Sequence, residues 1–254
     1  NHGRLDISTH PFCGGVPEDV RITTRYNEQD FMSSLMGVIH ETGHARYEQG
    51  LPAGWQGQPA GEARSMGIHE SQSLFFEMQL ARHPAFIQRI APLIKQHFGD
   101  QPALEAENLI QLYSRVEPGF IRVDADELTY PAHIILRFEI EQALIEGKIQ
   151  VHDLPEVWNT KMQQYLGLST KGNDAIGCMQ DIHWTDGSFG YFPSYTLGAL
   201  YAAQFAGAIE RDVGNIGDLI TAQDGLPLIF NWLRTHVWEK ASLLSTDELV
   251  RQAT

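Results

Sequence analysis

Two histidines one helical turn apart constrain the fold of this chain more than any other feature. Residues 40–44 read HETGH. They continue a row of side chains at i, i+4 spacing, formed by Met32, Met36, His40 and His44. Side chains so spaced share one face of an α-helix, which predicts a helix over 27–49. An HExxH helix brings two imidazoles together as tetrahedral zinc requires; the alternative is two partly buried histidines in a hydrogen-bonded core.

A catalytic zinc takes three protein ligands and keeps one position open for water. Glu41, beside the first histidine, is predicted to be the general base. We predict Glu70, in HESQ at 69–72, as the third ligand, because the Gly/Pro-rich loop before it allows two helices to pack antiparallel. The alternative for Glu70 is a solvated helix residue. His69 and Gln72 would support the ligands or contact substrate.

The rest of the chain is predicted to be mainly α. Further helices are expected over 62–82, 84–98, 102–116, 131–146, 154–166, 195–210 and 225–238. Residues 19–26 alternate like a strand, and 120–123 would pair with them in a small sheet. Neither a repeat nor a linker divides the sequence, so residues 1–254 are expected to form a single catalytic unit.

Charge and cysteine content exclude several classes of partner. The chain has 18 Lys+Arg and 32 Asp+Glu, a net charge of 18 − 32 = −14, which should repel nucleic acid and anionic membranes. The apolar run over 195–209 is too short to span a bilayer. Cys13 and Cys178 are too few for a disulfide scaffold and are interpreted as small buried hydrophobes rather than a redox pair. We therefore expect a cytoplasmic protein.

Six motifs follow one another along the chain in a fixed order. They are HPF at 10–12, DVRIT at 19–23, HETGH at 40–44, HESQ at 69–72, IRVDADELTY at 121–130 and GCMQDIHW at 177–184. Together they resemble the signature set of the thermostable carboxypeptidase Taq family of zinc metallocarboxypeptidases. The resemblance implies a helical zincin fold similar to that of angiotensin-converting enzyme and neurolysin, with a small β-sheet near the active-site groove. It also implies a homodimer that removes single C-terminal residues from peptides with broad specificity, using zinc or sometimes cobalt.

The resemblance also assigns roles to individual residues. It makes His40, His44 and Glu70 the metal ligands, Glu41 the general base, and Arg122 the residue that binds the terminal carboxylate of a peptide. An acidic chain that binds a carboxylate needs a local cation, and arginine can pair with a carboxylate through two hydrogen bonds. The alternative is a structural ion pair between Arg122 and its neighbours Asp124, Asp126 and Glu127.

The segment 177–195 combines polar donors with aromatic rings, and such donors can stabilise a developing oxyanion. By resemblance, His183 and Tyr195 face the reaction intermediate. Tyr191 could exchange roles with Tyr195, and aromatic packing is the alternative for each tyrosine. His10 is expected either to line the substrate site or to fix the loop that carries it.

These features predict metal-assisted hydrolysis of peptides, with Glu41 taking a proton from water. The rivals are an endopeptidase or dipeptidase of the same architecture, a metal- or peptide-binding fragment without activity, and a helical interaction protein. Members of the resembling family carry a further helical half before the HPF motif. Residues 1–254 are therefore expected to be the C-terminal part of a longer carboxypeptidase.

Overall fold

The computed structural model describes residues 2–9 and 11–254. Contacts between residues divide the chain into two compact units, of which unit 1 comprises Asn1–Tyr113 and Leu197–Thr254 and unit 2 comprises Ser114–Thr196. Each unit has a buried core of its own. One catalytic unit can contain two compact parts, so a single unit over 1–254 stays a prediction.

Unit 1 begins with a small mixed sheet of order β1-β3-β2. β3 (Asp19–Thr24) pairs in parallel with β1 (Gly3–Ile7) and antiparallel with β2 (Cys13–Val16). The predicted strand over 19–26 is thus confirmed. The predicted partner over 120–123 is wrong, because the Ala125 amide donates to the Arg122 carbonyl at 3.1 Å and closes a 3-10 turn, η5 (Arg122–Asp124).

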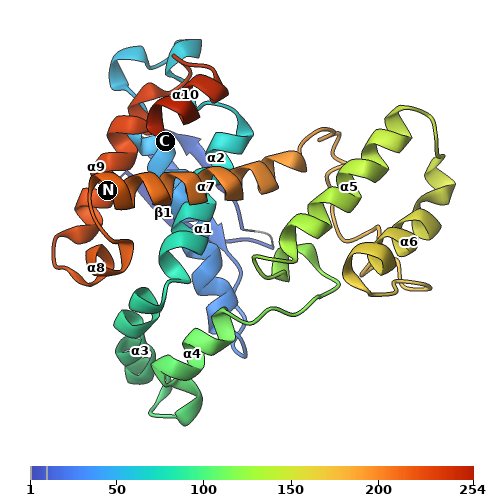
Figure 1. Cartoon of the computed structure of the whole chain (residues 1–254), viewed down its shortest axis with the longest axis horizontal. Coiled ribbons are helices and arrows are strands. Elements are labelled where there is room, and N and C mark those ends of the chain that lie inside the picture. The colour runs from blue at the N-terminus through green and yellow to red at the C-terminus, as the bar shows by residue number, and fades with distance from the viewer. Residues whose placement is uncertain (1, 10) are drawn as a thin grey trace. The chain divides into compact units, whose positions relative to one another are not determined.

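The HExxH and HESQ segments lie on two helices of unit 1, α1 (Phe31–Gly50) and α2 (Met66–Leu74) (Figure 1). α1 starts where the Asp30 side chain accepts a hydrogen bond from the Ser33 amide. α2 starts later than the predicted residue 62, because Ser65 caps it by accepting from the Ile68 amide. From Phe75 to Ala81 the backbone continues as a π-helix, η3.

The other elements are mostly helices, so the prediction of a mainly α protein with a small sheet is confirmed. In unit 1 they are η1 (Ala53–Trp55), η2 (Pro59–Gly61), α3 (Pro84–Phe98), η4 (Pro102–Leu104), α4 (Ala106–Tyr113), α8 (Ile216–Thr221), α9 (Gly225–His236), η7 (Trp238–Lys240) and α10 (Thr246–Ala253). In unit 2 they are η5, α5 (Tyr130–Ile145), η6 (Val151–Asp153) and α6 (Leu154–Leu166). α7 (Pro193–Asp212) runs across the boundary at 196/197, and neither α8 nor α10 was predicted. Over the described residues, the structure contains no helix with the length and apolar character needed to cross a membrane.

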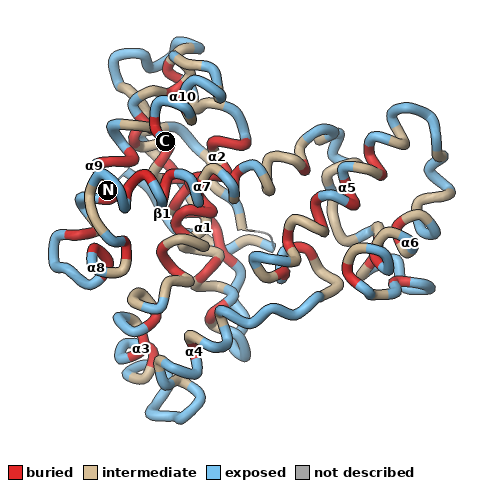
Figure 2. The backbone as a smooth tube through the Cα atoms, in the orientation of Figure 1, coloured by how far each residue is buried: buried red, intermediate tan, exposed pale blue. Residues whose placement is uncertain are grey.

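The core of unit 1 surrounds α1 and α2. Figure 2 draws α1 almost entirely in the colours of buried and intermediate residues, and Tyr47 on α1 is fully buried with Phe75, Phe205 and Trp238. Burial of each such side chain contributes about 2–3 kcal/mol. The two helices touch at Gly43, where a Cβ atom would lie 2.4 Å from the Gln72 carbonyl oxygen. The backbones that carry the HExxH and HESQ segments are therefore held in direct contact.

Candidate functional site

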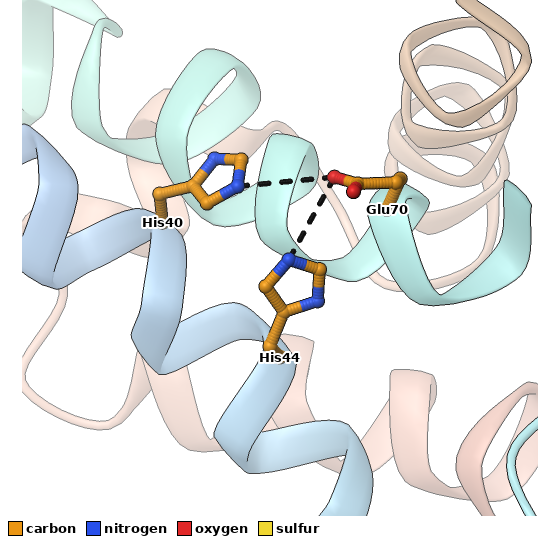
Figure 3. A group of neighbouring side chains, drawn as sticks. All are labelled: His40, His44 and Glu70. Carbon is orange, nitrogen blue, oxygen red and sulfur yellow. Dashed lines mark ion pairs between the residues drawn. The ribbon is translucent and has the colours of Figure 1, made fainter. Parts of the chain in front are cut away.

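α1 and α2 bring three potential metal ligands together (Figure 3). His40 and His44 lie one turn apart on α1, and their Nε2 atoms are 3.8 and 3.7 Å from the same oxygen, Oε2 of Glu70. One ligand atom from each residue lies within 4.8 Å of the others. Two imidazole nitrogens and one carboxylate oxygen are a donor set that zinc takes in catalytic sites. The three side chains therefore fit a metal ion.

A carboxylate from the π-helical segment orients His40. Oε2 of Glu77 lies 2.9 Å from Nδ1 of His40, and Oε1 of Glu77 accepts from Arg82 at 2.8 Å. Burial opposes protonation of His40, but the charges of Glu77, Glu70 and Glu41 outweigh it and raise the pKa of His40 to about 9. Because Nδ1 is engaged with Glu77, Nε2 is the nitrogen that would bind a metal, and its proton would leave as the metal binds.

A second histidine orients His44. Glu48 Oε1 lies 2.7 Å from His69 Nε2, and His69 Nδ1 lies 2.7 Å from His44 Nδ1. In a neutral His69 ring, Nε2–H donates to the carboxylate and Nδ1 accepts, so His44 must donate from Nδ1. Burial, with the charge of His40, lowers the pKa of His44 well below its usual value. His44 therefore turns the lone pair of Nε2 toward Glu70.

Glu70, the predicted third ligand, is 3% exposed, which argues against the solvated alternative. Ser73 donates to its Oε2 at 3.1 Å. Gly198 on α7 lies so near that a Cβ atom there would be 2.7 Å from Cβ of Glu70. The position of Glu70 is thus fixed by its own helix and by a close neighbour within unit 1.

Glu41 lies on α1 between the two histidines and is 7% exposed. Burial raises the pKa of its carboxyl to about 7. The charge of His40 lowers this pKa, and the charge of Glu70 raises it. A carboxylate whose pKa lies near neutral pH suits a group that accepts and returns a proton.

In unit 2, Arg122 pairs with a carboxylate far away in the sequence. Its Nε and Nη2 lie 2.9 and 2.8 Å from Oδ1 of Asp181, and its Nη1 lies 3.4 Å from the Tyr130 hydroxyl. Among the acidic neighbours considered from the sequence, Asp126 instead accepts from the backbone amides of Leu128 and Thr129. Arg122 is thus part of an ion pair, with Asp181 as its partner.

The aromatic segment of unit 2 surrounds this ion pair. The guanidinium carbon of Arg122 lies 4.6 Å from the ring centroid of Tyr195, and the Tyr195 hydroxyl is 2.9 Å from Nε2 of His183. The Tyr191 ring lies 5.6 Å from the His183 ring and 5.2 Å from the Tyr195 ring. Burial and the charge of Arg122 lower the pKa of His183 to about 4. Four residues singled out from the sequence thus form one cluster, while His10 lies outside the described residues.

Sequence reasoning missed three carboxylates of these networks: Glu48, Glu77 and Asp181. Glu77 follows Glu70 by two helical turns, a spacing that places both on one face of a regular helix, so it could have been considered. Asp181 lies inside a quoted motif, but its pairing with Arg122 spans 59 residues and leaves no local signal.

Known proteins match this chain over nearly its whole length. The profile of the carboxypeptidase Taq (M32) metallopeptidase family matches residues 1–254. "Carboxypeptidase 1" of Bacillus subtilis is 42% identical over 260 residues, covering 99% of this chain and 50% of the relative. "Thermostable carboxypeptidase 1" of Thermus thermophilus is 42% identical over 253 residues, covering 99% and 49%. The chain therefore spans about half the length of the curated relatives it matches.

Solved structures agree in fold. Trypanosoma cruzi metallocarboxypeptidase 1 superposes with a TM-score of 0.95 at 53% identity, over 100% of this chain and 53% of that protein. The M32 carboxypeptidase from Deinococcus radiodurans R1 gives a TM-score of 0.93 at 38% identity, over 100% and 51%.

Proposed function

Because the chain belongs to the carboxypeptidase Taq family of metallopeptidases, we propose that it acts as a metal-dependent carboxypeptidase that releases single C-terminal residues from peptides. One observation carries the proposal: Nε2 of His40 and Nε2 of His44 converge on Oε2 of Glu70. We propose zinc as the metal, with cobalt as a substitute, because this donor set matches the ligands that zinc takes in hydrolases. The chemistry that zinc supplies when bound by such ligands is Lewis acidity, which polarises a carbonyl and acidifies water.

Glu41 is the proposed general base. It accepts a proton from the attacking water and passes that proton to the departing amine. Its burial and its place between the two ligand histidines support this role.

Arg122 is the proposed binding residue for the C-terminal carboxylate of the substrate. Its guanidinium is held by Asp181, which fixes its orientation before substrate arrives. His183 and Tyr195 are the proposed donors to the oxyanion that forms at the scissile carbonyl, and the hydrogen bond between them supports a joint role. Tyr191 and His10 are proposed to contact the substrate.

Three finer parts of the proposal rest on the family resemblance: broad side-chain specificity, a homodimeric assembly and a cytoplasmic location. Light scattering after size-exclusion chromatography tests the assembly, with a mass twice that of the chain as the expected result.

Mass spectrometry tests the activity. The zinc-loaded chain is incubated with a peptide that has a free C-terminus and, separately, with the same peptide amidated. We expect stepwise loss of single residues from the free form alone. Internal cuts in both forms would indicate an endopeptidase, and release of dipeptides a dipeptidase. Zinc binding without cleavage would indicate a binding fragment.

A further inference from the structure

In unit 2, the carboxylate of Asp181 is shared between two guanidinium groups. Its Oδ1 accepts from Nε and Nη2 of Arg122, and its Oδ2 lies 2.6 Å from Nε of Arg137. The three side chains carry a combined charge of 2 − 1 = +1. This group, Arg122, Asp181 and Arg137, is called the arginine–aspartate cluster below.

Arg137 is built into the interior of unit 2. It is 0% exposed, its guanidinium carbon lies 4.6 Å from the Trp158 ring centroid, and Nη1 donates to the His133 carbonyl at 2.8 Å. Burial therefore prevents Arg137 from contacting a substrate itself. Whatever it does for a ligand, it does through Asp181.

The two histidines beside the cluster add no charge at neutral pH. Burial lowers the pKa of His133 and of His183 to about 4 in each case, and the charge of Arg137 or Arg122 acts in the same direction. Asp181 stays ionised, because the two guanidinium groups outweigh burial and lower the pKa of its carboxyl. The cluster is thus a local positive charge in a chain whose net charge is −14.

The sharing of Asp181 between two arginines determines how much positive charge remains at Arg122. A carboxylate that pairs with one arginine alone cancels its charge and competes with any incoming anion. A second guanidinium on the other oxygen compensates the carboxylate, so that the hydrogen bonds orient Arg122 while its positive charge remains available.

We propose that Arg137 and Asp181 are positioning residues that hold Arg122 in place with one surplus positive charge, so that the cluster takes a single monoanionic group, the C-terminal carboxylate of a peptide. The inference rests on the role proposed for Arg122 above. It adds two residues to that role and states the charge on which recognition depends.

The test is a series of variants that changes the cluster charge stepwise. Binding is measured by calorimetry on the full zinc-loaded chain carrying Glu41→Gln, which blocks turnover. The probes are an N-acetylated alanine peptide with a free C-terminus and its C-terminal amide. The readout is the free-acid preference, defined as the Kd of the amide divided by the Kd of the free acid.

We expect the unmodified cluster to prefer the free acid by about tenfold or more. Arg137→Met takes the charge from +1 to 0 and should lower the preference by about tenfold, whereas Arg137→Lys, the matched control, should keep it within about threefold. The double variant Arg137→Met/Asp181→Asn returns the charge to +1 and keeps one side-chain oxygen that can accept from Arg122, so it should regain most of the preference. If Arg137 only stabilised the fold, a further change at Asp181 would not restore the free-acid preference.

Retention of the full preference by Arg137→Met, or failure of the double variant to regain it, would overturn the inference while leaving the role of Arg122 intact. Equal binding of acid and amide by the unmodified cluster would overturn both. Circular dichroism checks folding. If Arg137→Met does not fold, Arg137→Gln decides: it keeps a donor toward Asp181 but also takes the charge to 0, so the preference should fall by about tenfold, and an unchanged preference would refute the inference.

Discussion

Replacing Gly43 by alanine should push apart α1 and α2, the two helices that carry the proposed metal ligands. A Cβ atom at this position would lie 2.4 Å from the Gln72 carbonyl oxygen and 2.6 Å from the Ser73 Cα. Ordinary contact begins at 3.4 Å, so the helices must separate by 3.4 − 2.4 = 1.0 Å unless the backbone distorts. Both close atoms belong to the backbone and cannot move aside as a flexible side chain would.

The consequence for metal binding follows from coordination geometry. Metal–ligand distances tolerate deviations of about 0.2 Å, far less than the required separation. Glu70 would move away from His40 and His44, and we expect the Kd for zinc to rise by at least about tenfold. Overpacking should cost about 1–3 kcal/mol of stability. The better helix propensity of alanine offsets about 0.5–1 kcal/mol of that cost.

Gly37→Ala is the matched control on the same helix. Its Cβ atom would approach no nearer than 3.7 Å, to Cγ of Pro11, so this variant should bind zinc like the parent and be equally or more stable. Zinc affinity is measured by competition with a chromophoric chelator, and stability by urea unfolding of the metal-free chain. Equal zinc affinities for the two variants would refute the reasoning that helix contact at Gly43 sets the ligand geometry.

Three further predictions follow from individual side chains. Glu77→Gln keeps an acceptor for Nδ1 of His40 but removes the charge, so the Kd for zinc should rise by about tenfold in the same chelator assay; an unchanged Kd would show that Glu77 does not support the ligand. Burial and the charge of Arg137 lower the pKa of His133 from 6.5 to about 4, so the unfolded chain binds more protons between these pH values. The free energy of unfolding should therefore fall by about 2–3 kcal/mol as pH drops through this range, and urea titrations should show a shallower fall for His133→Gln. Glu41→Gln should retain zinc and lose peptide cleavage, and surviving turnover would contradict its role as the base.

The sequence was most informative where chemistry and helical spacing coincide. The i, i+4 spacing of His40 and His44, and the place of Glu70 beyond a Gly/Pro-rich loop, predicted three side chains whose ligand atoms the structure brings within 4.8 Å of one another. Local periodicity encodes such sites. It does not encode the partners that orient them, because the Nδ1 partners of the two histidines come from 37 and 25 residues away.

The elements that the sequence did not predict also lack a local signal. β1 is largely exposed and β2 contains two glycines, so neither shows the alternation by which a half-buried strand is recognised. Their pairing with β3 depends on tertiary contacts. The π-helix from Phe75 to Ala81 reads as a normal helix in the sequence, because a small change in backbone winding leaves the apolar pattern nearly intact.

The division of unit 1 into two separated segments has a consequence for how the protein is made. Residues 114–196 are synthesised after α1 and α2 but before the segment Leu197–Thr254. That later segment supplies Phe205, Trp232 and Trp238 to the core around Tyr47, and it places Gly198 against Glu70. On the ribosome, α1 and α2 emerge 197 − 74 = 123 residues before the segment that encloses them begins, a delay of about 6–25 s at about 5–20 residues per second. The proposed metal ligands are thus translated well before the residues that complete their surroundings.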